Sequence, residues 1–484
     1  MTHTTIIAAH NQTRPAVQGS GRPRLPPSHD AGSTARIAVV GGGLAGITAA
    51  LVAADAGARV VLYESKPRLG GLTHSFRRHG LWVDNGQHVF LRCCVSYRRL
   101  LRRLGVAGLA PLQPRLDIPL RGPDPVGRIR DGRLRSVRLP APAHLTTSVL
   151  RFGWLPASER LRFGRAALAL RTVDPADPRI DSQSFGDWLR DHDQAAETIS
   201  TLWDLFTVPT LNGHVDDVSL ALAATMFQIG LLTDPSAADI GISTVPLQQL
   251  HGDAAAVALA TAGVDVRTDA RISALDDLGQ DQDGQHAGGP DGIVLATPPA
   301  VTEALLPAGA VNLPAGWSDR LGGVPIINLH LVLDRPVLHQ PFLATVSSPL
   351  QWIFDRTRQS GLADGQYLAV SLSAADELAD QPTRVLRERF EPELRRLLPG
   401  MAEARIRDFF VTRERLATFR PAPGCSAFRP QAGTADPRIV LAGAWTDTGW
   451  PATMEGAVRS GETAAATVLR RVHTIATDQQ EAAV

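Results

Sequence analysis

The sequence predicts an α/β protein in which a Rossmann-like, dinucleotide-binding domain carries an inserted α+β domain. Three observations predict this fold class. An apolar strand runs into a glycine-rich turn and an Ala-rich helix at 37–56, and a second strand follows at 58–63, as in a βαβ unit. Two later apolar runs, at 292–297 and 438–443, read as buried strands. Between these segments the pattern changes to separate runs of strands and helices, which is typical of an inserted α+β domain.

The composition is that of a globular protein without a dominant charge. The chain has 484 residues, enough for two or three domains, with 44% hydrophobic and 20% charged residues. A net charge of +1 gives no field for binding nucleic acid, so no nucleic-acid partner is predicted. The cysteines, Cys93, Cys94 and Cys425, have the spacing of neither a zinc site nor a disulfide framework. They indicate reduced thiols in a cytosolic protein without a metal site.

Neither the N-terminal segment nor the longest apolar run predicts a membrane span. Residues 1–33 are rich in Thr, Pro, Gly and Ser without an apolar core, which predicts a disordered leader over 1–35 rather than a signal peptide. The run between Asp217 and Asp234 holds sixteen uncharged residues and is too short to cross a bilayer. A short tail is expected at 473–484.

The glycine turn at 41–46 predicts a diphosphate site. Its glycines have the G-x-G-x-x-G spacing: Gly41 permits the tight turn, Gly43 lets the backbone approach the diphosphate, and Gly46 lets the helix pack on the strand. The helix start offers backbone N–H groups and the positive end of its dipole. Glu64 ends the second strand about twenty residues later, where an acid bonds the ribose hydroxyls. A plain βαβ turn without a ligand is the alternative.

A glycine pair, Gly70 and Gly71, follows the ribose-binding acid. Such a pair is more typical of flavin enzymes than of NAD enzymes, because the chain must run back beneath the diphosphate and ribityl, and glycine leaves the room that a side chain would take. The alternative is a simple turn. Arg68 is expected either near a phosphate or on the solvated surface.

A polar run, Asp84-Asn85-Gly86-Gln87-His88, lies between a strand containing Leu81 and Val83 and the apolar residues 89–91. Each unpaired buried polar group costs about 1–3 kcal/mol, so these residues need partners. Two interpretations are open: the side chains satisfy one another and the backbone, or they face a ligand. We call residues 84–88 the polar knot.

The middle of the chain reads as alternating β-rich and helical segments. Residues 111–139 are rich in Pro, Gly and Arg and predict strands, and residues 144–171 predict two amphipathic helices separated by Pro156. This helix pair either packs on its own domain or lies in a membrane interface with its arginines on anionic lipid. Further helices are predicted at 97–104, 185–189, 195–207, 216–232, 247–262 and 383–398, and further strands at 264–267, 326–333 and 367–372.

The C-terminal strand at 438–443 leads into a predicted helix over 451–471. Pro451 suits a first helical turn, and Thr453, Met454 and Ala457 follow it. This geometry aims a second helix N-terminus at an electron-rich ring carbonyl.

With both ends of the chain interpreted, the sequence resembles the FAD-dependent amine-oxidase and phytoene-desaturase superfamily. Within it, the sequence is similar to the squalene-associated branch, the hydroxysqualene dehydroxylases. The resemblance rests on the polar knot, on Trp352-Ile353-Phe354-Asp355-Arg356, on Leu202-Trp203 through Leu211-Asn212, and on Trp445-Thr446 through Gly449 to Gly461. It covers roughly residues 36–468.

The resemblance implies FAD and a two-dinucleotide-type architecture. The FAD-binding domain is expected at 36–115, 246–310 and 436–472, and the substrate domain at 116–245 and 311–435. Two residues depart from the family pattern: Leu72 replaces a basic residue, and Ala444 replaces an Asp for which Asp447 is the expected substitute. The predicted FAD contacts are Gly41, Gly43, Leu44, Ala45, Gly46, Glu64, Ser65, Arg68, Gly70, Gly71, Leu72, Thr73, Gln87, His88, Val266, Gly443, Asp447, Thr453, Met454 and Ala457.

The implied activity is reductive removal of the allylic hydroxyl of hydroxysqualene, which gives squalene on a route towards hopanoids. His88 and Asp84 are the predicted catalytic acids, and Trp203, Trp352 and Trp450 the predicted pocket residues. No second G-x-G-x-x-G follows a strand, so an external reductase or a free NAD(P)H must supply electrons. Because the polyprenoid substrate is insoluble in water, peripheral contact with the inner face of the plasma membrane is expected of a cytoplasmic protein.

Three alternatives follow from the same motifs. A carotenoid-type desaturase would oxidise its polyprenoid. An amine oxidase would carry a lysine facing the flavin, whereas Lys66 is the only lysine and sits at the nucleotide end. A prenyl-binding escort protein would keep the fold without flavin.

Overall fold

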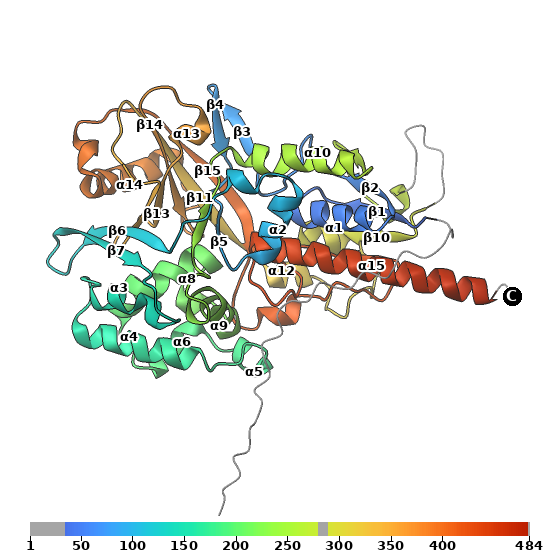
Figure 1. The fold of residues 1–484 in the computed structure, drawn as a ribbon, viewed down its shortest axis with the longest axis horizontal. Coiled ribbons are helices and arrows are strands. Elements are labelled where there is room, and N and C mark those ends of the chain that lie inside the picture. The colour runs from blue at the N-terminus through green and yellow to red at the C-terminus, as the bar shows by residue number, and fades with distance from the viewer. Residues whose placement is uncertain (1–33, 279–288, 483–484) are drawn as a thin grey trace, which may run out of the picture.

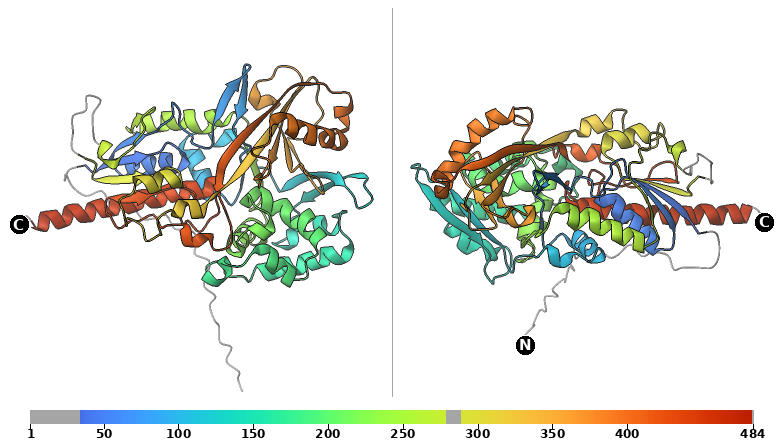
Figure 2. Two further views of the ribbon diagram at one scale, coloured as in Figure 1. Left: turned by 180° about the vertical axis from the view of Figure 1, so that it is seen from behind. Right: turned by 90° about the horizontal axis from the view of Figure 1, so that it is seen from above.

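The computed structural model describes residues 34–278 and 289–482 (Figure 1). Residues 1–33 of the leader predicted at 1–35, residues 279–288, and the last two residues of the predicted tail lie outside the described residues. Three layers are visible: a sheet with helices on both faces, a larger curved sheet, and a group of helices beneath it (Figures 1 and 2).

The first sheet is parallel, with strand order β16-β10-β1-β2-β9. Its strands are β1 (Arg36–Val40), β2 (Arg59–Tyr63), β9 (Asp265–Arg267), β10 (Gly292–Leu295) and β16 (Ile439–Leu441). The chain proceeds from β1 outward through β2 to β9 and returns on the other side through β10 and β16. The carboxyl end of β1 is therefore the topological switch point, where ligands bind in sheets of this kind.

Helices cover both faces of this sheet because its strands are apolar on both sides. One face of the sheet packs on α1 (Leu44–Asp55), α2 (Val95–Arg103), α10 (Ala254–Thr261) and α15 (Met454–Ala482). The other face packs on α11 (Pro299–Leu305) and α12 (Trp317–Leu321). The C-terminal helix α15 runs beside α1, and a Cβ on Gly461 would lie 2.3 Å from the carbonyl oxygen of Ala45. This close crossing brings the start of α15 to the glycine turn.

The second sheet has seven strands in the order β15-β11-β14-β13-β12-β6-β7 and is antiparallel except for the β12–β6 pair. Its strands are β6 (Asp117–Pro123), β7 (Ile129–Arg135), β11 (Gly323–Leu333), β12 (Phe342–Thr345), β13 (Trp352–Asp355), β14 (Gln366–Leu372) and β15 (Ile406–Phe419). One face buries apolar side chains against α14 (Thr383–Leu397). The opposite face turns towards the helical layer and the first sheet. A short helix α13 (Thr357–Ser360) follows β13.

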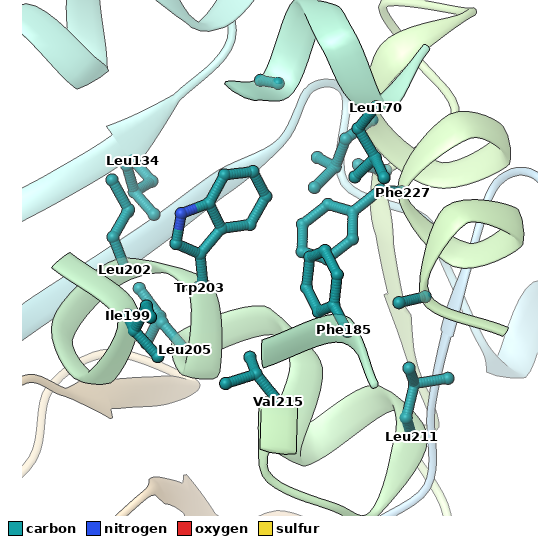
Figure 3. Packing of buried hydrophobic residues seen from close by; sticks show 14 of the residues in the cluster. Leu134, Leu170, Phe185, Ile199, Leu202, Trp203, Leu205, Leu211, Val215 and Phe227 are labelled. Atoms are coloured by element: carbon teal, nitrogen blue, oxygen red, sulfur yellow. The ribbon is translucent and has the colours of Figure 1, made fainter. Parts of the chain in front are cut away.

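The helical layer encloses an aromatic cluster around Trp203, Phe185 and Phe227 (Figure 3). Its helices are α3 (Thr146–Leu150), α4 (Ala157–Leu170), α5 (Pro178–Asp181), α6 (Phe185–Asp191), α7 (Ala196–Thr198), α8 (Asp204–Leu211) and α9 (Leu220–Phe227). Wider π-helical turns at Ile199–Trp203, Gln228–Leu232 and Gln248–Asp253 precede α8, follow α9 and precede α10. The short 3-10 turns are Ala107–Leu109, Ala143–Leu145, Val215–Asp217, Leu275–Asp277, Pro399–Ala402 and Cys425–Phe428.

Two small sheets hold the polar knot at the junction of these layers. β3 (Ser75–Arg78) pairs with β4 (Leu81–Asp84), which ends at the knot, and β5 (Val89–Leu91), which begins just after it, pairs with β8 (Ile240–Ile242). Because β8 comes from the segment predicted for the substrate domain, the knot is fixed between both predicted domains.

Three predicted helices have different bounds in the structure. The helix predicted at 47–56 begins at Leu44, directly after Gly43. The long helix predicted at 216–232 begins at Leu220, because the Ser219 hydroxyl accepts the Ala221 N–H and caps it. The C-terminal helix begins after Pro451, at Met454, and runs through much of the predicted tail to Ala482.

Candidate active site

The glycine turn forms a cradle that larger residues would fill. Gly41 has φ +111°, and a Cβ there would lie 2.4 Å from the carbonyl oxygen of Ala296. A Cβ on Gly46 would lie 1.8 Å from the carbonyl oxygen of Gly41, so only glycine lets α1 approach β1 this closely. At Gly43 the nearest atom to a Cβ is 3.8 Å away, which leaves open space above the turn.

The N-terminus of α1 faces that space without a cap. Gly43 is the N-cap residue, no side chain caps the helix, and its first turn has no acidic residue. The N–H groups of Leu44, Ala45 and Gly46 at this end are ones that an α-helix leaves without an internal partner. An uncapped first turn beside a glycine cradle fits a diphosphate group.

Glu64 stands at the end of β2, beside the cradle. Its buried carboxylate accepts the Gly42 N–H at 2.6 Å and the Lys66 N–H at 2.8 Å, and the Ser65 hydroxyl lies 3.2 Å away. A carboxylate has about four lone-pair positions, so it keeps capacity for a ribose hydroxyl. Val266, on the neighbouring strand β9, lies opposite Leu62 of β2.

The glycine pair packs directly on the cradle. The Gly70 N–H donates to Gly42 O at 2.9 Å, and a Cβ on Gly71, which has φ +54°, would lie 2.8 Å from the Cα of Gly43. Thr73 is buried and its hydroxyl donates to Gly70 O. Arg68 donates to Gly71 O, whereas Leu72 is 47% exposed. The two glycines therefore let two backbone segments touch where a side chain would separate them.

The far end of the chain contributes the start of α15. The Thr453 hydroxyl accepts the Gly456 N–H, and Met454 and Ala457 lie in the first turn. Gly443, at the end of β16, has φ +146° and donates its N–H to the Ser460 hydroxyl. The side chain of Asp447 is exposed and accepts a hydrogen bond from Gln431, and its substitution for the acid absent at Ala444 stays a prediction.

Asp84 is fixed in a buried ion pair. Its carboxylate accepts from Arg356 at 2.5 Å, from the Ser75 hydroxyl at 2.5 Å and from the Leu247 N–H at 3.0 Å. Both charged side chains are 6% exposed. This arrangement favours the first interpretation of the polar knot for Asp84: a carboxylate whose contacts are all donors and which joins the end of β4 to the end of β13 and to the residue before the π-helical turn at Gln248–Asp253.

Asn85 is likewise satisfied by its surroundings, while His88 is not tied into the network in the same way. The Asn85 side chain donates to Leu72 O at 2.7 Å and accepts the His74 N–H. His88 is half-buried beside Gly86, and enclosure lowers its pKa to about 4, although the Asp84 charge opposes this shift. Near neutral pH its imidazole is therefore uncharged. Gln87 lies between them and is half-buried.

Polar side chains on β11 and β15 of the second sheet lie next to the polar knot. Asn328 of β11 donates to Asn85 O at 3.4 Å, and Thr412 of β15 donates to the same oxygen at 3.2 Å. The Thr412 hydroxyl also bonds His330, whose other ring nitrogen bonds the hydroxyl of Tyr367. Asn328 is fully buried, and its Oδ1 has no partner among the described residues.

The buried histidines predict a loss of stability in acid. His330 is fully buried, and burial lowers its pKa to about 3, below the roughly 6.5 of the unfolded chain. The unfolded state thus binds more protons as the pH falls from about 6.5, and the ring removes up to about 1.4 kcal/mol of folding free energy per pH unit. In urea unfolding from about pH 6.5 to 4.5, His330→Phe should reduce this slope by that amount. The exposed His339→Phe should leave it unchanged, and an unaltered slope for His330→Phe would contradict the assignment.

The predicted pocket residues lie in three different settings. Trp203 is fully buried in the helical layer, where its indole N–H donates to Gln194 and its ring contacts Phe185 and Phe227 (Figure 3), and its place in a pocket stays a prediction. Trp352 is half-buried on the sheet face that turns towards the helices, beside Phe354. Trp450 is half-buried, with the guanidinium of Arg459 over one ring face at 4.8 Å.

Several residues of the site were not predicted. Arg356 was part of a recognised segment without an assigned role, and Asn328 lies in a strand that reads as apolar. Glu414 alternates with arginines on β15, a pattern that reads as a solvated edge. The pairing of β15 with β11 brings Asn328 and Glu414 to the side of the polar knot. The ion pair with Asp84 brings Arg356 there.

Comparison with known proteins identifies a family and several relatives. The family described as flavin containing amine oxidoreductase matches residues 44–469. The hydroxysqualene dehydroxylase of Rhodopseudomonas palustris is 28% identical over 452 residues, covering 89% of this chain and 97% of the relative, and that of Zymomonas mobilis is 27% identical, covering 88% and 97%. The 15-cis-phytoene desaturase of Synechococcus elongatus is 25% identical, covering 90% and 96%.

Solved structures show the same fold. An oxidoreductase from Methanosarcina mazei superposes with a TM-score of 0.65 at 14% identity, covering 88% of this chain and 98% of that protein. Putrescine oxidase with bound putrescine gives 0.65 at 18% identity, covering 90% and 99%.

Proposed function

Because the chain belongs to the flavin-containing amine oxidoreductase family, we propose that it is an FAD-dependent hydroxysqualene dehydroxylase. The observation that carries this proposal is similarity along nearly the whole chain to hydroxysqualene dehydroxylases from three organisms, at 27–28% identity. Their names supply the reaction: removal of the hydroxyl of hydroxysqualene, which gives squalene.

The cradle residues fit FAD and would hold it along its length. Its diphosphate would lie on the glycine turn and the uncapped start of α1, and its adenosine ribose on Glu64 beside Val266. The glycine pair and the start of α15 would border the rest of the cofactor. The proposed contacts are those predicted from the sequence, including Asp447, whose exposed carboxylate accepts from Gln431.

The proposed reaction removes a hydroxyl as water and leaves an allylic cation. Bound FAD in its reduced form supplies the hydride that closes this cation. The protein must exclude water and nucleophiles around the cation. Trp352 is half-buried between the second sheet and the helical layer, with the buried rings of Phe354 and Phe342 behind it, and we propose that it borders the prenyl tails.

The ion pair of Asp84 with Arg356 supports an anchoring role for Asp84 in the polar knot. His88, neutral near pH 7, is a hydrogen-bonding group beside Gly86. Both catalytic assignments stay predictions, and Asp84→Asn and His88→Ala with FAD bound are the substitutions that test them.

The decisive experiment uses the purified holoenzyme reduced with dithionite under anaerobic conditions. Incubation with hydroxysqualene should yield squalene by mass spectrometry, together with reoxidation of the flavin absorbance. If the reduced holoenzyme formed no squalene under these conditions, the proposal would be wrong. A colourless protein that still binds the polyprenoid would instead indicate an escort protein.

The electron donor in the cell is proposed to be NAD(P)H or a separate reductase.

A second candidate function is favoured by the likeness to 15-cis-phytoene desaturase. It would run in the opposite direction, with oxidised enzyme introducing double bonds into a carotenoid-type polyprenoid. Oxidised holoenzyme incubated with phytoene separates the two, because a dehydroxylase leaves phytoene unchanged. An amine oxidase would turn over putrescine or cyclohexylamine and release peroxide; Lys66, the one lysine, is exposed near the nucleotide end.

Peripheral membrane contact is proposed for the outer face of α3 and α4. Among the described residues, none of the helices combines the length and the apolar character that crossing a bilayer requires. Leu150, Leu161 and Leu168 are 54%, 60% and 53% exposed there, between exposed arginines such as Arg162 and Arg165. Apolar side chains interleaved with cations fit the surface of an anionic membrane.

The membrane proposal predicts co-sedimentation with vesicles rich in phosphatidylglycerol at low salt. Leu161→Asp with Leu168→Asp should reduce the bound fraction at least several-fold, because both exchange apolar burial for charge repulsion. The matched control places two aspartates on the first domain, at Val257 and Val301, which are 70% and 44% exposed. Equal sedimentation of both variants would contradict this docking face.

A further inference from the structure

The proposed dehydroxylation needs a proton donor that neither predicted acid supplies well. A hydroxyl is a poor leaving group until its oxygen is protonated. Asp84 is engaged in a buried ion pair with Arg356, and enclosure keeps His88 uncharged near neutral pH. The inference below rests on the proposed function and names the acid for it.

Glu414 lies on the sheet face that turns towards the polar knot. In the β11–β15 pair, Asn328 is opposite Thr412 and Ile326 is opposite Glu414. Alternate residues of a strand share a face, so Glu414 points to the same side as Thr412, which donates to Asn85 O. The intervening Arg413 belongs to the other side, where it donates to Gln381 O near α14.

The carboxyl of Glu414 is surrounded by groups of the candidate site. The side chain of Asn85 is hydrogen-bonded to it, and the charge of Arg68, beside the glycine pair, acts on it. Glu414 is half-buried, so its carboxyl is partly shielded from bulk water. Unlike Asp84, which forms a buried ion pair with Arg356, Glu414 forms no ion pair among the described residues.

Asn328 supplies an independent sign that this corner takes a polar ligand. Its side chain is fully buried two residue pairs along the strands from Glu414, and its Oδ1 has no hydrogen-bond partner among the described residues. Diagonal neighbours on one face of an antiparallel pair are about 7–8 Å apart, so a single oxygen can be reached by both side chains. An unpaired buried acceptor next to an acid fits an alcohol, which donates one hydrogen bond and accepts another.

Burial also favours the protonated form of this acid. It raises the pKa of the Glu414 carboxyl above its usual value, against the opposing effects of the Asn85 hydrogen bond and the Arg68 charge. A raised pKa is what a carboxylic acid needs to carry a proton nearer to neutral pH.

We propose that Glu414 protonates the leaving hydroxyl of the substrate while Asn328 Oδ1 accepts the hydrogen bond of that hydroxyl. The proton moves from the Glu414 carboxyl to the hydroxyl oxygen, the C–O bond breaks, and both bonding electrons leave with the oxygen as water. The carboxylate that remains is stabilised by Arg68 and takes a new proton from solvent. The allylic carbon accepts the hydride named above, so one hydroxyl, one proton and one hydride become one C–H bond and one water.

The test compares Glu414→Gln on two substrates with the reduced holoenzyme. With hydroxysqualene the rate of squalene formation should fall by about 10²- to 10⁴-fold, the usual contribution of a positioned acid. With the allylic acetate of hydroxysqualene, whose leaving group needs no proton, the variant should reach within about tenfold of the parent. A residue that only supports the fold or the flavin would lower both rates together.

Two controls and a pH profile sharpen the result. Glu388→Gln, on the exposed side of α14, should match the parent on both substrates, and His88→Gln should not show the substrate-dependent rescue. The groups facing Glu414 are Arg68 and Asn85, with His74 and His88 the titratable rings of the neighbouring loop. The parent rate with hydroxysqualene should decline as the pH rises through the Glu414 pKa, and the variant should lose that decline.

The outcomes separate this inference from the proposed function. A parental rate of Glu414→Gln on hydroxysqualene overturns the inference while leaving the dehydroxylase proposal intact. So does an equal loss on both substrates with FAD still bound. If the parent itself makes no squalene, the proposed function fails first, and the acetate experiment has no parental rate to compare.

Discussion

Gly43→Ala weakens FAD binding by roughly 5- to 150-fold while leaving the apoprotein as stable as the parent. The nearest atom to the new methyl group is 3.8 Å away and Gly43 has φ −78°, so the apoprotein meets neither a clash nor backbone strain. The methyl would stand where the diphosphate approaches the uncapped helix end. An overpacked contact costs about 1–3 kcal/mol, which corresponds to this range of dissociation constants. Titration of apoprotein with FAD, followed by flavin fluorescence, measures it.

Gly46→Ala separates the ligand effect from a folding effect. Its methyl would lie 1.8 Å from the carbonyl oxygen of Gly41, so the turn must shift and the apoprotein itself should lose about 1–3 kcal/mol or more of stability. Gly164→Ala, in a helix with nothing within 4 Å of the new methyl, is the matched control and should raise stability by up to about 1 kcal/mol without affecting FAD. If Gly43→Ala bound FAD as tightly as the parent, the diphosphate could not lie in the space above the turn.

Arg356→Leu should destabilise the protein by about 3–5 kcal/mol. The substitution leaves the Asp84 carboxylate buried without its counter-charge, and an uncompensated buried charge is far more costly than a missing surface ion pair. Because Asp84 also holds the Ser75 hydroxyl and the Leu247 N–H, flavin loading should decrease as well. Urea unfolding of the apoprotein gives the free energy, and flavin absorbance gives the loading.

A double-mutant cycle identifies the source of this loss. Asp84→Asn together with Arg356→Leu removes both charges, so the pair should be less destabilised than the sum of the single variants. Arg384→Leu removes a partner of the exposed Glu388 and should cost less than about 1 kcal/mol. Additive effects of the two buried substitutions would show that Asp84 and Arg356 do not interact in solution.

The cradle could be predicted from the sequence because its determinants are local. Strand β1, the three glycines and the start of α1 follow one another within residues 36–46, and Glu64 ends the next strand. Their spacing alone fixes which backbone groups face the switch point. The buried strands β10 and β16 were also predicted, since strands covered on both faces are apolar throughout.

The chemistry of the polar knot could not be predicted in the same way. Asp84 and Arg356 are 272 positions apart, and Asn85 meets Thr412 across 327 positions. Nothing in either local sequence indicates such a partner. Trp203 was assigned to a pocket by likeness, yet the π-helical turn that carries it points the ring into the aromatic cluster of the helical layer.

The sequence by itself determined the dinucleotide cradle. The glycines and the helix start are consecutive in the chain, and the ribose-binding acid ends the next strand, so their relative positions follow from one local βαβ unit. Only the tertiary structure decided which side chains of the polar knot are free to act. A carboxylate becomes an anchor or an acid according to its neighbours: Asp84 meets a buried arginine, whereas Glu414 meets an amide and a more distant charge. Those neighbours come from strands of another sheet, and chain folding alone brings them together.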